Sequence, residues 1–140
     1  MCRMLYIASN VELPLLPWDG DDPGFHVTKL GDTEAAVKTN FKNEHVYYTG
    51  AYEGCGCGFQ AGEFPGYEDE EIDLKLKSLS GLANYLDEQL NKGMEIELFM
   101  CWDGDQSQPT EHKRTISTES IPDRNFWFKE IEHLLVKSKG

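Results

Sequence analysis

The sequence predicts an α/β or α+β fold, with a single domain built on a mixed sheet of about four or five strands. Two observations lead to this class. A long amphipathic helical pattern lies between two β-rich stretches, and shorter β-rich stretches occur elsewhere along the chain. The chain has 140 residues, of which 39% are hydrophobic, enough for one core in one domain.

The first fifty residues contain several short elements. Residues 3–8 and 45–52 are rich in β-forming side chains and predict strands, with residues 25–30 as a further candidate. Between them, Thr33 precedes a helix-favouring stretch and predicts a short capped helix.

Apolar residues recur at helical spacing over residues 69–92, which predicts a long helix directly after a glycine-rich loop. Gly93 is suited to ending this helix because glycine adopts the left-handed conformation at low cost. Apolar and polar residues then alternate over 94–102, and the second face turns apolar toward the end. This pattern predicts a strand that enters the interior.

The last thirty residues predict two more elements. Residues 113–119 are polar but β-branched, as expected for an edge strand. Ser120 and Asp123 resemble a helix start, and the apolar residues that follow repeat at helical spacing, so we expect a C-terminal helix. The competing interpretation is a strand with Phe126 and Phe128 on one face.

The order strand, helix, strand over residues 45–102 predicts two strands that point the same way. Their carboxyl ends carry the two most unusual loops of the chain, and ligands of open parallel sheets bind at such ends. An antiparallel strand starting at Arg3 brings Cys2 to the same edge. The candidate thiol or metal site is therefore Cys2, Cys55, Cys57 and Cys101. The candidate pocket-lining residues are Gly54, Gly56, Gly58, Trp102 and Asp103.

The stretch Gly54-Cys55-Gly56-Cys57-Gly58 is the strongest chemical motif. A Cys-x-Cys pair can close a small disulfide ring or offer two soft ligands to a transition metal, whereas the structural alternative is a glycine turn with buried thiols. A thiol-bound transition metal is therefore the candidate cofactor. Residues 56–61 fit a degenerate dinucleotide pattern, but the loop continues through Gly66 and acidic residues follow, so we expect no nucleotide cofactor.

The formal net charge of −12 repels nucleic acid and anionic membrane surfaces. It suits a basic protein partner, and the alternative function is accordingly an acidic protein-interaction module without catalytic activity. The sequence has no signal-peptide core and no membrane-length apolar run, which predicts a cytoplasmic protein.

Four segments carry a resemblance to known proteins: residues 2–9, Val46-Tyr47-Tyr48-Thr49-Gly50, residues 54–59 and residues 101–104. With these segments the chain resembles a small uncharacterised bacterial protein family, with an N-terminal strand of the form MCxxLYIAS and a GCGCGF loop. The resemblance implies a bacterial cytosolic origin and assigns no site. The start Met1-Cys2-Arg3 also resembles class II glutamine amidotransferases, although the Asn-Gly-Asp loop of those enzymes is missing from the sequence.

Overall fold

A computed structural model describes residues 2–21, 24–59, 72–123 and 126–138. Its centre is a six-stranded mixed sheet in the order β2-β3-β1-β4-β6-β5. The strands are β1 (Arg3–Ser9), β2 (His26–Lys29), β3 (His45–Gly50), β4 (Ile96–Trp102), β5 (His112–Ser117) and β6 (Glu132–Lys137). All neighbouring pairs are antiparallel except β5 and β6, which are parallel.

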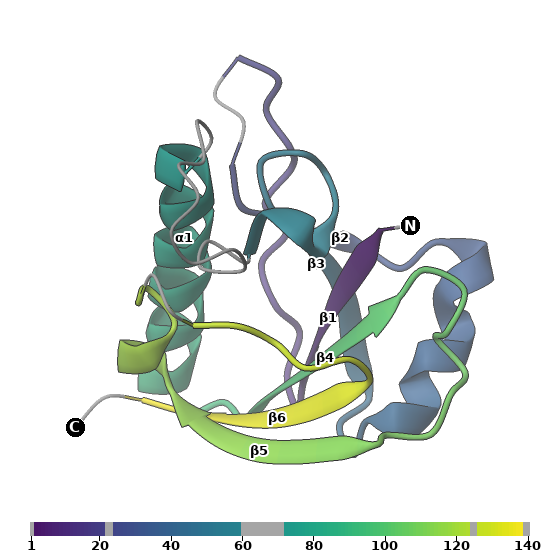
Figure 1. The fold of residues 1–140 in the computed structure, drawn as a ribbon. Helices are drawn as coiled ribbons and strands as arrows, with labels where there is room; N and C mark the ends of the chain where they lie inside the picture. Colours follow the sequence, from purple (N-terminus) through teal and green to yellow (C-terminus); the bar gives the residue numbers. More distant parts are fainter. Residues whose placement is uncertain (1, 22–23, 60–71, 124–125, 139–140) are drawn as a thin grey trace.

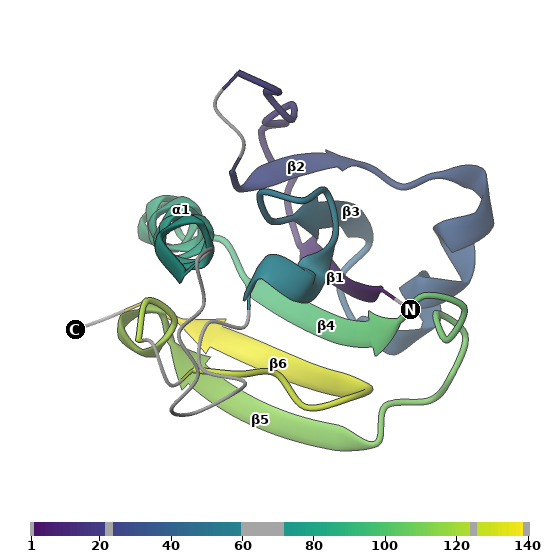
Figure 2. The same ribbon diagram turned by 45° about the horizontal axis from the view of Figure 1, so that its top comes forward.

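One long helix, α1 (Ile72–Asn91), packs on one face of the sheet (Figures 1 and 2). Three 3₁₀ helices complete the described elements: η1 (Asp32–Asn40), η2 (Gly56–Phe59) and η3 (Thr118–Ser120). The predicted long helix is confirmed from Ile72 onward, while residues 69–71 of that prediction lie outside the described residues. None of the described helices combines the length and the apolar character that crossing a membrane requires.

Strand β1 is the centre of the sheet and runs antiparallel to both β3 and β4. Its residues Leu5 to Ala8 are fully buried, because the sheet is covered on both sides of this strand. Strands β3 and β4 therefore point the same way, as predicted, but β1 lies between them. The carboxyl ends of β3 and β4 and the start of β1 consequently lie together at one end of these strands.

The two faces of the sheet bury different amounts of apolar surface. On the first face, α1 contributes Leu79, Leu82 and Leu86 to a large core. On the second face, η1 inserts Val37 into a smaller core with Tyr6 and Phe99. A fold with one fully covered face and one partly covered face leaves room for polar residues on the second.

The prediction of a C-terminal helix is wrong: residues 132–137 form strand β6. Helical spacing had grouped Trp127 with Leu135, yet these side chains are 53% and 48% exposed, so no helical stripe is buried. Instead Leu134 and Val136 face the α1 core and alternate with the more exposed His133 and Leu135. The competing strand around Phe126 and Phe128 is also wrong, because both phenylalanines are buried in an irregular segment before β6.

The structure also corrects the number of strands, which is six among the described residues rather than four or five, because β6 replaces the expected helix. The edge strand predicted over 113–119 is confirmed as β5, and the short helix predicted near Thr33 is confirmed as η1. Its cap differs from the predicted one: the Glu34 carboxylate accepts a hydrogen bond from the Gly31 amide at 2.9 Å. The described chain is thus a mixed sheet with segregated helices, an α+β arrangement.

Candidate metal centre

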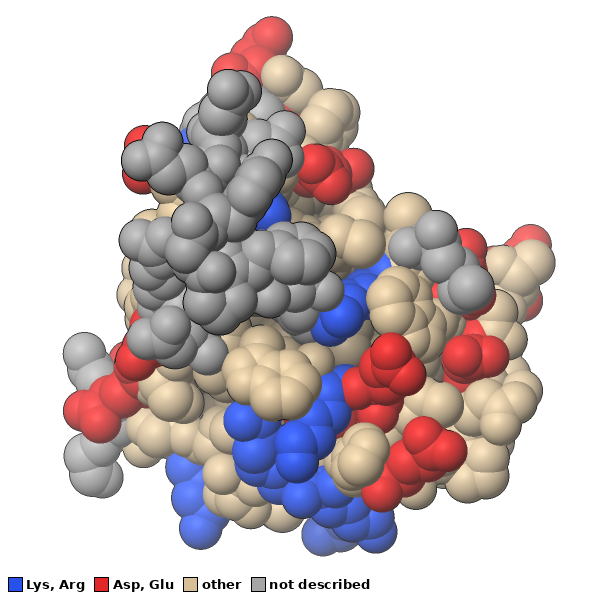
Figure 3. Space-filling model, in the orientation of Figure 1, with Lys and Arg blue, Asp and Glu red and all other residues tan. Residues whose placement is uncertain are grey.

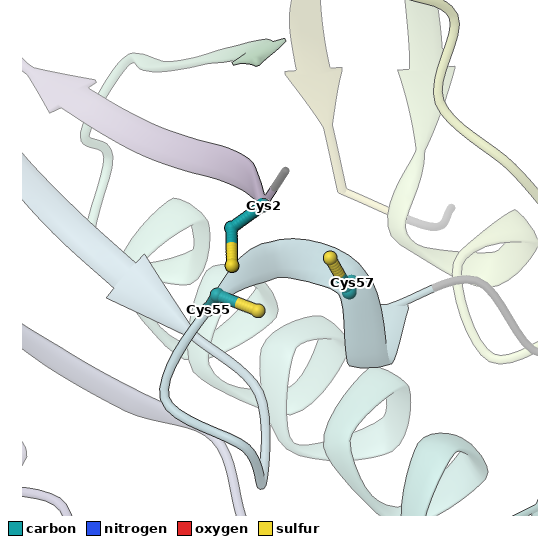
Figure 4. Close-up of side chains that lie close together, drawn as sticks. All are labelled: Cys2, Cys55 and Cys57. Carbon is teal, nitrogen blue, oxygen red and sulfur yellow. The ribbon is translucent and has the colours of Figure 1, made fainter. Parts of the chain in front are cut away.

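Three of the four cysteines lie close together at the end of the sheet where β1 begins and β3 ends. The sulfur atoms of Cys2, Cys55 and Cys57 all lie within 4.8 Å of one another. Figure 4 shows them converging from the start of β1, the loop after β3, and η2. Cys2 is exposed, whereas Cys55 and Cys57 are half-buried.

The loop after β3 owes its shape to a tight turn. The Ala51 amide donates to the Cys55 carbonyl at 2.9 Å, and the Gly54 amide donates to the Ala51 carbonyl at 3.0 Å. Gly54 has a φ of 92°, in the left-handed region that glycine adopts without steric cost. The Tyr48 hydroxyl donates to the Gly54 carbonyl and so ties the turn to β3. Cys55 therefore leaves the turn in a fixed direction.

Gly56 allows η2 to lie directly against β1. A Cβ atom at this position would be 2.9 Å from the Arg3 carbonyl oxygen, closer than real Cβ atoms approach. The contact brings the Arg3 amide within 3.3 Å of the Cys57 sulfur, to which it donates a hydrogen bond. Gly58, the last of the three glycines predicted to line a pocket, is buried against Ala51 and Tyr52.

Trp102 and Asp103 position Cys2 from the neighbouring strand. The Asp103 amide donates to the Cys2 carbonyl at 2.8 Å and extends the pairing of β1 with β4 by one residue. The Arg3 guanidinium lies over the Trp102 ring at 4.9 Å. Trp102 and Asp103, predicted as pocket lining, thus contact Cys2 and Arg3 at the start of β1.

The prediction that Cys101 joins the other cysteines is not supported by the described geometry. Cys101 is buried in the smaller core, on the face of the sheet away from α1, with Tyr6 and Phe99. The reason is the alternation of side chains along β4, which turns Cys101 away from the α1 face. Burial, together with the nearby Asp105 and Asp103, raises the pKa of its thiol to about 12.

Burial also raises the pKa of the Cys55 thiol to about 12. The backbone of Cys57 lowers this pKa, but its thiol, and that of Cys2, raise it by hydrogen bonding and charge repulsion. At neutral pH Cys55 is therefore a neutral thiol. A cation placed among the three sulfurs would reverse this balance, because it favours the thiolate form.

A second polar cluster was missed by the sequence analysis. His133 of β6 contacts Glu97 of β4, with 2.7 Å between Nε2 and Oε1. The same carboxylate accepts hydrogen bonds from the amides of Lys42 and Asn43 and from the Asn43 side chain. Glu97 is only 3% exposed, and its place within an apolar run was the one available signal. The partner His133 was hidden by the expectation of a helix.

No protein-family model matches this chain, and no curated protein or solved structure matches it either.

Proposed function

We propose that this protein binds a soft metal ion through the thiolates of Cys2, Cys55 and Cys57, with a fourth coordination position left open. The observation that carries the proposal is the convergence of three sulfur atoms within 4.8 Å. Three sulfurs bound at about 2.3 Å from a common ion lie about 3.8–4.0 Å apart. Small side-chain rotations close the difference.

The ligand set favours thiophilic ions. Thiolates select Zn²⁺ and Cu⁺ over hard cations such as Mg²⁺ or Ca²⁺. The hydrogen bond from the Arg3 amide to the Cys57 sulfur suits a metal-bound thiolate, because donors to sulfur help to carry its negative charge. The proposal thus concerns a Zn²⁺ or Cu⁺ ion bound by three sulfurs.

The surroundings favour an exchangeable ion over one that holds the fold together. Structural zinc sites are closed by four protein ligands, whereas three ligands leave the ion open to a further partner. Cys2 is exposed, so this open position is reachable from solvent. The large core between α1 and the sheet stabilises the fold without help from an ion.

Metal binding explains the site better than thiol redox catalysis does. A catalytic cysteine reacts as a thiolate and usually has a lowered pKa. The pKa of Cys55 is instead raised to about 12, first by burial.

A cytoplasmic location forms part of the proposal, since a reducing compartment keeps cysteines free to bind metal.

The test is metal binding by the reduced protein and by two matched variants. We expect wild type to bind Zn²⁺ or Cu⁺ in competition with a chromophoric chelator. Cys57→Ser should weaken binding by about 100-fold or more, since loss of a ligand exceeds the outer-shell effect. Cys101→Ala removes a buried thiol that is not part of the three-sulfur cluster and should leave the affinity unchanged. Equal affinity of wild type and Cys57→Ser for both ions contradicts the proposal.

The acidic protein-interaction module stays the alternative, motivated by the net charge of −12. It predicts association with a basic partner that weakens as salt is added. Pull-downs at low and high ionic strength test it, and recovery of no basic partner at low ionic strength would remove its motive.

A further inference from the structure

The partly covered face of the sheet carries an open groove of about 920 Å³ beside η1. Its floor is formed by strands β4, β6 and β5, which present Glu97, His133 and Lys113. The end of η1 and the loop between β4 and β5 form its two rims. The groove is distinct from the cysteine cluster, since none of the three cysteines lines it.

Asn40 joins the two rims and holds the groove open in one shape. Its side-chain amide donates to the carbonyls of Gln106 and Gln108, at 3.2 and 3.0 Å. Its carbonyl oxygen accepts from the Thr110 hydroxyl at 2.9 Å. A site bounded by such side-chain hydrogen bonds is largely formed before any ligand arrives.

The groove reverses the charge balance of the chain. Acidic residues outnumber basic ones by 25 to 13 in the whole sequence, yet among the described residues the groove is lined by Lys42, Lys113 and Arg114 and by one carboxylate, Glu97. On the face of the molecule drawn in Figure 3, Lys and Arg side chains gather in the lower part of the view, with Asp and Glu side chains beside them. Arg114 is engaged by Glu132 at 3.0 Å, whereas Lys42 and Lys113 form no ion pair with a described carboxylate.

The one carboxylate of the groove is already satisfied by protein donors. Burial alone would raise the pKa of Glu97, but hydrogen bonds from His133, Asn43 and Lys42 lower it to about 2. Its negative charge is therefore offset within the protein. On the part of the chain that the structure describes, the second ring nitrogen of His133, Nδ1, has no hydrogen-bond partner.

We propose that this groove binds a small anion bearing a carboxylate or phosphate group, held by Lys42, Lys113 and His133. The two ammonium groups supply the attraction, and His133, whose Nε2 contacts Glu97, lines the floor of the groove with its other ring nitrogen, Nδ1, available to the ligand. Hydroxyl groups of Thr39, Ser107 and Thr115 along the lining offer further donors. The net charge of −12 excludes long polyanions, because they also meet the acidic surface outside the groove.

Titration of the reduced, metal-free protein tests the proposal by amide chemical shifts in NMR spectra. The probes are inorganic phosphate and citrate, each added at constant ionic strength. We expect saturable shifts with at least one probe, and the probe that binds more tightly identifies the preferred anionic group. Absence of saturable shifts with both probes overturns the proposal.

Three variants locate the binding. The double substitution Lys42→Gln with Lys113→Gln should raise the dissociation constant by about tenfold, because two charged contacts are lost. His133→Gln should also weaken binding, while its amide can still donate to Glu97 and so preserve the fold. Lys29→Gln, on β2 at the far end of the sheet, removes the same charge and should have no effect. Equal weakening by Lys29→Gln, or none by the double substitution, contradicts the site.

Discussion

The cysteine cluster and the Glu97–His133 pair are two polar sites in one sheet, and their surroundings act in opposite directions. Burial raises the pKa of both Cys55 and Glu97. At Glu97, donors from three residues outweigh burial and lower the pKa to about 2. At Cys55, the thiols of Cys57 and Cys2 raise the pKa in the same direction as burial.

The two sites differ in whether protein groups stabilise the charged form of the buried side chain. Protein donors hold Glu97 in its charged form, so this residue stabilises the folded chain directly. Cys55 is instead a neutral thiol beside two further thiols, and a bound cation would favour its charged form. A buried carboxylate here is part of the structure, whereas the thiols form a site for a ligand.

The largest effect that tests this comparison is expected for Glu97→Gln. The NH2 group that replaces one carboxylate oxygen would face either the Lys42 amide, which bonds Oε1, or the two Asn43 donors, which bond Oε2, and would leave that set unsatisfied. We expect a loss of about 2–3 kcal/mol in the free energy of unfolding at pH 7, measured by chemical denaturation. The neighbouring Glu95→Gln, at an exposed position, serves as the matched control and should change little.

The effect of Glu97→Gln on the unfolding free energy should also depend on pH. The pKa of Glu97 is lowered from 4.5 to about 2 on folding, so its ionisation stabilises the folded state above about pH 4.5. This contribution is lost as the pH falls through the folded pKa. The gap in unfolding free energy between wild type and Glu97→Gln should therefore shrink from pH 4.5 toward pH 2. A gap that stays constant over that interval contradicts the role assigned to the carboxylate.

A medium effect is expected for Gly56→Ala. The new Cβ would lie 2.9 Å from the Arg3 carbonyl oxygen, so η2 must move away from β1. We expect a loss of about 1–3 kcal/mol in unfolding free energy, together with weaker metal binding, because Cys57 moves with η2. Gly24→Ala is the control, since its nearest neighbour is the flexible Lys77 side chain at 3.9 Å. Unchanged metal affinity in Gly56→Ala would show that the packing of η2 does not position the sulfurs.

The smallest effect is expected for Cys55→Ser in the metal-free protein. A half-buried neutral thiol contributes little to folding, so the unfolding free energy should change by no more than about 0.5 kcal/mol. With Zn²⁺ or Cu⁺ added, wild type should gain stability by ligand binding and Cys55→Ser should gain less. Thermal denaturation with and without the ion measures both. A large loss without metal would show that the thiols hold the fold.

Local sequence patterns predict the long helix, five of the six strands and the position of the cysteine loop. These features depend on local spacing: the helical repeat of 72–91, the alternation along β4, and the glycines that surround Cys55. The sequence also predicted that Cys2 reaches the same edge, because antiparallel pairing alone brings the start of β1 there.

The sixth strand and the contacts within the two sites depend instead on segments that are distant in the sequence. Apolar residues at 127–135 fit a helical repeat, but pairing with β4 and β5 satisfies the backbone of β6 and overrides that local preference. The contact of Glu97 with His133 follows from strand order and register. It is not encoded in the spacing of neighbouring residues, since it depends on which distant strand lies alongside.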